Sequence, residues 1–158
     1  MKKISPVVAM LLACCSLLFA DPPTAQTARD VETKIWHQIS NLKHLANGQA
    51  LDTTDYSQSF SSLCSQASYV SSLTQIGSDL NSAEPKNMDY RGYKEKGSLT
   101  SLYFKEISSD LPPIAGSGEQ ANPVWYVIID VTADGKIDNL EFYHSNQKPS
   151  NFSGYTSS

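Results

Sequence analysis

Residues 124–143, VWYVIIDVTADGKIDNLEFY, decide the fold of this chain. Two strand-like runs flank Asp134-Gly135, a dipeptide that is typical of a two-residue hairpin turn. Pairing outward from that turn sets Ile129 opposite Leu140 and sorts the side chains onto two faces. One face collects the large apolar residues Trp125, Val127, Ile129, Leu140 and Phe142. The other face is mixed and half polar, so we predict a hairpin with one buried face.

The same residues also fit a calcium loop of the EF-hand type. Residues 130–141 place oxygen-bearing groups at the ligand positions and Gly135 at the sharp turn. The ligands would be Asp130, Thr132, Asp134, Lys136 (through its carbonyl), Asp138 and Glu141. An EF-hand needs a helix on each side, but Pro123 and the β-branched and aromatic residues after it predict a strand. We therefore favour the hairpin and keep calcium as the alternative cofactor.

The first half of the chain predicts two amphipathic helices. The apolar residues Val31, Ile35, Ile39, Leu42 and Leu45 recur at helical spacing. Asn47-Gly48 then predicts the end of the first helix. A second helix, rich in serine, is expected to start at residues 52–55 and to continue to about Leu80.

After the helices the pattern changes to that of strands. Residues 90–93 and 99–107 have strand composition, and the hairpin follows. We predict an α+β domain over residues 27–144, with two N-terminal amphipathic helices packed on a three- to four-stranded antiparallel sheet. Residues 145–158 are polar and are expected to form a flexible tail. The element order resembles that of small exported cystatin-like or NTF2-like domains, but no motif accompanies this resemblance, so it implies no site residue.

Residues 1–20 predict a bacterial export signal. Lys2 and Lys3 precede a run that is mostly apolar, and Ala20 offers a small residue for cleavage. The run is shorter than the roughly 20 apolar residues of a spanning helix. Residues 11–14 (LLAC) resemble a lipobox, which gives lipidation of Cys14 as an alternative. We expect a periplasmic or secreted protein, or one attached to the envelope by a lipid.

The functional prediction is a binding protein of the envelope without catalytic activity. A formal net charge of −4 and the lack of a basic block disfavour nucleic acid as a partner. No nucleophile, base and acid stand in a recognisable pattern. Tyr126, Ile128 and Tyr143 on the outer sheet face, together with the Pro/Gly-rich loop 108–123, are the predicted surface for a protein or peptide. The alternatives are a calcium-binding protein and, third, a hydrolase of unknown type.

Overall fold

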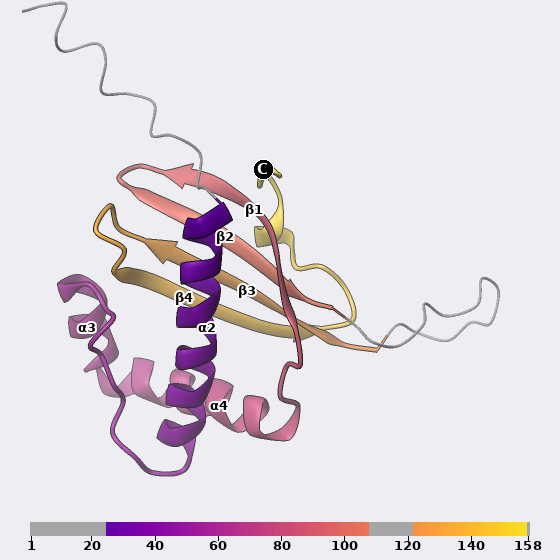
Figure 1. The fold of residues 1–158 in the computed structure, drawn as a ribbon. Helices are drawn as coiled ribbons and strands as arrows, with labels where there is room; N and C mark the ends of the chain where they lie inside the picture. Colours follow the sequence, from indigo (N-terminus) through magenta and orange to yellow (C-terminus); the bar gives the residue numbers. More distant parts are fainter. Residues whose placement is uncertain (1–24, 108–121, 158) are drawn as a thin grey trace, which may run out of the picture.

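The computed structural model describes residues 25–107 and 122–157, which form an α+β domain with its α-helices before its strands (Figure 1). The helices are α2 (Ala25–Ala46), α3 (Gln58–Cys64) and α4 (Ala67–Ser82), and the strands are β1 (Met88–Lys96), β2 (Leu99–Glu106), β3 (Val124–Val131) and β4 (Ile137–Ser145). The predicted export signal with Cys14 and most of the 108–123 loop lie outside the described residues. Within the described ranges, no helix has the length and apolar character needed to cross a membrane.

The four strands form an antiparallel sheet in the order β1-β2-β3-β4. The predicted hairpin is confirmed, and its register from Trp125 to Asp130 is the predicted one, with Ile129 opposite Leu140. The turn itself differs from the prediction. The Thr132 amide donates to the Lys136 carbonyl at 2.9 Å, which gives a three-residue loop with Gly135 at φ +78°. Asp138 is then left out of the pairing as a bulge, and this bulge restores the register.

One face of the sheet, which we call the helical face, packs against the helices (Figure 1). The five residues predicted for the buried face of the hairpin all lie in this core, together with Leu102 and Phe104 of β2 and the apolar stripe of α2. Helices α2 and α4 approach closely at Gly77, where an added Cβ would lie 2.0 Å from the Leu42 carbonyl oxygen. Glycine is therefore required at this crossing of the two helices.

The prediction of one long second helix is wrong in two places. Residues 52–56 are not helical, because the Ile137 amide donates to the Asp55 carbonyl and the Ser57 amide donates to the Ile137 carbonyl. These bonds keep the chain extended beside the start of β4. Helix α3 begins only after Ser57, whose hydroxyl accepts from the Phe60 amide at 3.1 Å. A break at Ser65 and Gln66 then separates α3 from α4, so the described residues contain three α-helices.

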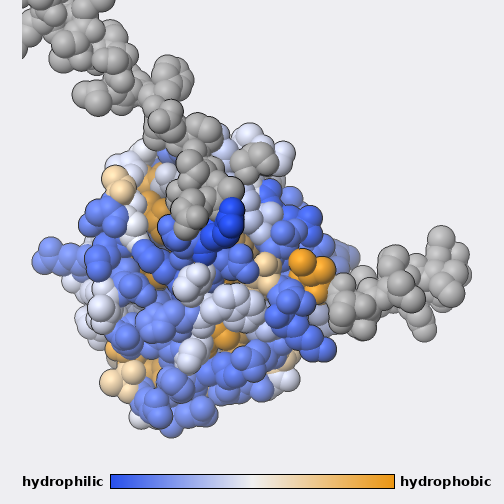
Figure 2. Space-filling model, viewed as in Figure 1, coloured by the Kyte–Doolittle hydropathy of each residue, from blue (hydrophilic) through white to orange (hydrophobic). Residues whose placement is uncertain are grey.

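The two sides of the molecule are covered differently. The helical side is largely hydrophilic on its surface, with small separate hydrophobic patches (Figure 2). On the opposite side, residues 146–157 fold back across the sheet and include a short 3-10 helix, η1 (Ser150–Phe152). We call these residues the C-terminal arm. These residues were expected to form a flexible tail, and in the structure Phe152 is fully buried and Thr156 pairs with Tyr93 of β1.

Candidate functional site

The candidate site lies on the outer face of the sheet, the face away from the helices, beneath the C-terminal arm. A second apolar cluster, separate from the main core, is formed there by Tyr103, Val124, Tyr126, Ile128 and Phe152, with Tyr155 against it. The arm leaves β4 at Ser145, crosses the outer face and reaches the free edge of β1. Tyr93 and Thr156 exchange two backbone hydrogen bonds there, at 2.9 and 2.8 Å.

Phe152 is the anchor of the C-terminal arm. Its ring is 0% exposed and packs edge-on against three tyrosines of β2, β3 and β4. The ring centroids lie 4.9 Å from Tyr103, 5.5 Å from Tyr126 and 5.5 Å from Tyr143. Such edge-to-face pairs add to the free energy gained from burial alone. The outer face therefore contains a built aromatic socket, and the chain's own residue fills it.

Glycine at position 92 makes room for the end of the arm. Gly92 has φ +146°, and a Cβ at this position would lie 2.5 Å from the Thr156 carbonyl oxygen. A bulge in β1 occurs at the same place, between Tyr90 and Gly92. Glycine in a strand often marks a bulge or a close backbone approach. Here it permits both, so the edge of β1 is shaped to receive an extended segment.

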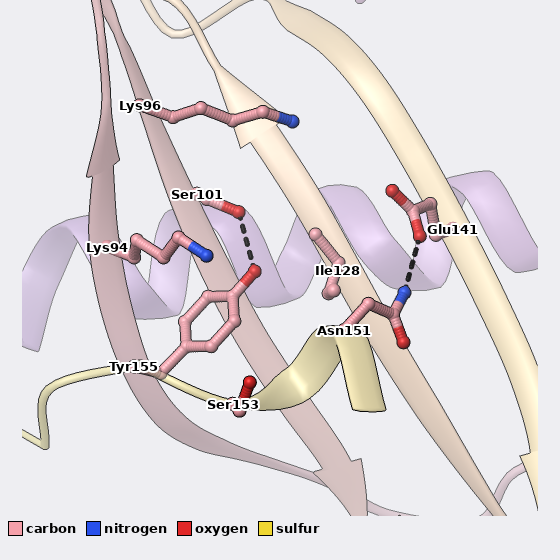
Figure 3. A pocket seen from close by; sticks show the side chains of 8 residues that line it. All are labelled: Lys94, Lys96, Ser101, Ile128, Glu141, Asn151, Ser153 and Tyr155. Carbon is pink, nitrogen blue, oxygen red and sulfur yellow. Dashed lines mark hydrogen bonds between the residues drawn. The ribbon is translucent and has the colours of Figure 1, made fainter. Parts of the chain in front are cut away.

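A polar cavity of about 240 Å³ lies between the C-terminal arm and the sheet (Figure 3). Its lining residues come from both sides and are Lys94, Lys96, Ser101, Ile128 and Glu141 of the sheet and Asn151, Ser153 and Tyr155 of the arm. The hydroxyls of Ser101 and Tyr155 are 2.8 Å apart and share a hydrogen bond across the cavity. Burial raises the pKa of Tyr155, although the Ser101 bond partly opposes this shift.

One ion pair at this cavity joins an exposed lysine to a buried carboxylate. Lys96 Nζ is 2.8 Å from Asp130 Oδ2, and the Asp130 side chain is 1% exposed. The hydrogen bond to Asp130 raises the pKa of Lys96. The second carboxylate oxygen, Oδ1, is buried and has no hydrogen-bond partner among the described residues. A buried carboxylate with one free oxygen is costly unless its cation stays in place, so Lys96 is fixed by its partner.

Glu141 is also held by internal donors. Its Oε1 accepts from Asn139 at 2.9 Å, and its Oε2 accepts from the Tyr143 hydroxyl at 2.8 Å and from Asn151 at 2.9 Å. The Asn151 amide also donates to the Tyr143 hydroxyl at 3.0 Å. This network ties η1 of the C-terminal arm to β4, and it places a carboxylate at one wall of the cavity (Figure 3).

The six predicted calcium ligands point in different directions. Asp130 faces Lys96 on the outer face, whereas Asp138 accepts from the Ser57 and Ser59 hydroxyls at 2.5 and 2.7 Å. Asp134 accepts from the Thr132 hydroxyl within the turn, and the Lys136 carbonyl accepts from the Thr132 amide. In the part of the chain that the structure describes, no group of three or more His, Cys, Asp or Glu side chains is placed to bind a metal. The calcium interpretation stays a prediction.

The predicted partner surface lies at this site but is largely covered. Tyr126 and Ile128 are each 4% exposed beneath the C-terminal arm, and Tyr143 is 37% exposed at its border. Sequence reasoning missed Lys94, Lys96 and the arm residues, because the first strand was expected to end near Tyr93 and the tail to be flexible. The available signal was the presence of Phe152 and Tyr155 in an otherwise polar segment.

Comparison of the chain with known protein families, with curated proteins and with solved structures finds no match.

Proposed function

We propose that the protein is an exported binding protein of the bacterial envelope, without catalytic activity, and that it recognises a protein or peptide segment on the outer face of its sheet. The observation that carries this proposal is the seating of Phe152 in a socket of three tyrosines. The C-terminal arm occupies the recognition surface in the way that a bound peptide would. A partner segment that bears an aromatic residue takes the place of the arm.

The contacts of the arm support this proposal because they combine two common modes of peptide recognition. Thr156 adds one antiparallel backbone pair to the free edge of β1, as in strand addition. Phe152 supplies an aromatic anchor in a desolvated pocket, the usual form of a binding hot spot. An extended peptide bound in the same direction would use both features.

The arm is held by few buried groups, which supports its replacement by a partner. Phe152 is its one buried residue, whereas Asn151 and Thr156 are exposed. Most of its remaining contacts are hydrogen bonds near the solvent, and each of these contributes only about 1 kcal/mol net. Segments with few buried apolar contacts open at free energies well below that of global unfolding.

The direct test is to supply the arm in trans. A chain that ends at Ser145 is mixed with a labelled peptide of residues 146–158, and binding is followed by fluorescence anisotropy. We expect saturable binding that is lost with a Phe152→Ala peptide and kept with a Ser157→Ala peptide, because Ser157 is exposed. The same titration on full-length Phe152→Ala protein serves if the shortened chain does not fold. Equal binding of the wild-type and Phe152→Ala peptides would contradict the proposal.

The binding partner and the cellular localisation need separate experiments. Capture from an envelope extract is compared between the full-length chain and the chain that ends at Ser145, with free arm peptide as competitor. We expect a partner that binds the shortened chain more strongly and that the competitor releases.

Mass spectrometry of the protein from the envelope fraction distinguishes an N-terminus at Asp21 from a lipidated Cys14. An intact Met1 in the cytoplasmic fraction alone would contradict export.

A further inference from the structure

The cavity beneath the C-terminal arm contains ammonium and hydroxyl donors together with one carboxylate, that of Glu141. Glu141 already accepts three hydrogen bonds from Asn139, Tyr143 and Asn151, so its oxygens are largely satisfied. The hydroxyls of Ser101 and Tyr155 share one hydrogen bond, which leaves one O–H hydrogen of the pair free to donate. A ligand in this cavity would therefore be an acceptor of hydrogen bonds.

The two lysines of the cavity differ in how their charge is balanced. Lys96 is paired with the buried Asp130 at 2.8 Å. Lys94 has no carboxylate within ion-pair distance among the described residues, and its Nζ lies 5.5 Å from the centre of the Tyr155 ring. Figure 3 shows the Lys94 ammonium beside Tyr155 and Ser101, at the wall of the cavity. The Lys94 ammonium thus stands next to a hydroxyl donor, and the Glu141 carboxylate at another wall has no cation within ion-pair distance among the described residues.

We propose that this cavity binds a small organic carboxylate. The carboxylate accepts from the Lys94 ammonium and from the hydroxyl pair of Ser101 and Tyr155, while a short apolar part of the ligand rests on Ile128. A volume of about 240 Å³ equals the share of about eight water molecules, which is enough room for a ligand of a few carbon atoms. This site shares Ile128 and the C-terminal arm with the proposed recognition surface, but the binding of a carboxylate does not require that a peptide partner exists.

Binding at this site also acts on the C-terminal arm. The cavity walls come partly from the sheet and partly from the arm, so a ligand contacts both. A ligand that binds only when the arm is docked shifts the equilibrium toward the docked state. The small carboxylate therefore opposes removal of the arm by a partner.

The test is an NMR titration of the full-length protein with sodium acetate, propionate and lactate, with sodium chloride at equal ionic strength as reference. We expect saturable shifts of the backbone amides of Ser101, Ser153 and Tyr155 at millimolar carboxylate, together with slower amide exchange at Thr156. The Lys94→Met variant keeps the long side chain without its charge and should bind about tenfold more weakly or worse.

The matched control is Lys105→Met. Lys105 lies over the Tyr126 ring at 5.7 Å, on the same outer face, but does not line the cavity. Its replacement should leave the titration unchanged. Shifts that sodium chloride reproduces, or equal binding by the wild type and Lys94→Met, would overturn the proposal. Both outcomes are independent of whether the arm peptide binds in trans.

Discussion

The two faces of this one sheet are closed in contrasting ways. The helical face is covered by three helices and carries a large apolar core, in which residues such as Phe104 and Ile129 are fully buried. The outer face is covered by a single short arm, with tyrosines beneath it and lysines and carboxylates around the cavity at its border. The first arrangement stabilises the domain, because removing it exposes the core. We expect the second to open without loss of the fold, because Phe152 is the one buried residue of the arm.

Two phenylalanines, each 0% exposed, allow a direct comparison of the faces. Phe104 of β2 points into the helical core, where its ring centroid lies 5.6 Å from that of Tyr90. We expect Phe104→Ala to lower the free energy of unfolding by about 3–5 kcal/mol, since it leaves a cavity in a rigid core. Chemical denaturation followed by circular dichroism measures this loss.

Phe152→Ala removes a phenylalanine of equal burial from the outer face, and its effect should be smaller. We expect the free energy of unfolding to fall by about 1–2 kcal/mol. The arm can detach from the sheet, so the loss cannot exceed the free energy with which the arm docks. The same denaturation experiment gives the value, and the native far-UV spectrum should be kept. A loss as large as that of Phe104→Ala would mean that the arm belongs to the core.

The smallest expected effect is at the junction between the helices and β4. The hydroxyls of Ser57 and Ser59 donate to Asp138 and hold the pKa of its carboxyl below the ordinary value. A lowered folded pKa gives stability that is present above about pH 3.9 and is lost as the pH falls through the folded value. Asp138→Asn should therefore flatten the acid side of the stability curve, measured as denaturation midpoints against pH.

Ser59→Ala checks the cause of that shift. It removes one donor to Asp138 and leaves Ser57, which also caps α3, in place. The pKa of Asp138, followed by NMR of its carboxyl carbon, should move up toward the ordinary value. An unchanged pKa would show that the Ser59 hydrogen bond does not contribute to the shift.

The helical face could be predicted from the sequence because its signals are periodic. Alternation around Gly135 sorted the hairpin residues correctly, and the spacing from Val31 to Leu42 identified the buried stripe of α2. The exact turn could not be predicted, since a three-residue loop with a bulge at Asp138 produces the same register as a two-residue loop. The extended segment at residues 55–57 depends on pairing with Ile137, which is distant in sequence.

The outer face could be predicted only in part. Alternation placed Tyr126 and Ile128 correctly on this face, but it did not predict that the C-terminal arm covers them. The C-terminal arm has the polar composition of a disordered tail, and its position depends on one aromatic anchor and on backbone contacts at Gly92. The cavity combines side chains from β1 to β4 and the arm, and no local pattern brings such residues together.

Native-state hydrogen exchange tests the central contrast most directly. The amides of Tyr93 and Thr156 report the docking of the C-terminal arm, and those of Leu102 and Ile129 report the sheet. The account predicts that the amides of Tyr93 and Thr156 exchange through a local opening whose free energy is several kcal/mol lower than that of global unfolding. The amides of Leu102 and Ile129 should exchange only through global unfolding. Equal opening free energies at all four amides would contradict it, because the arm would then be an inseparable part of the fold.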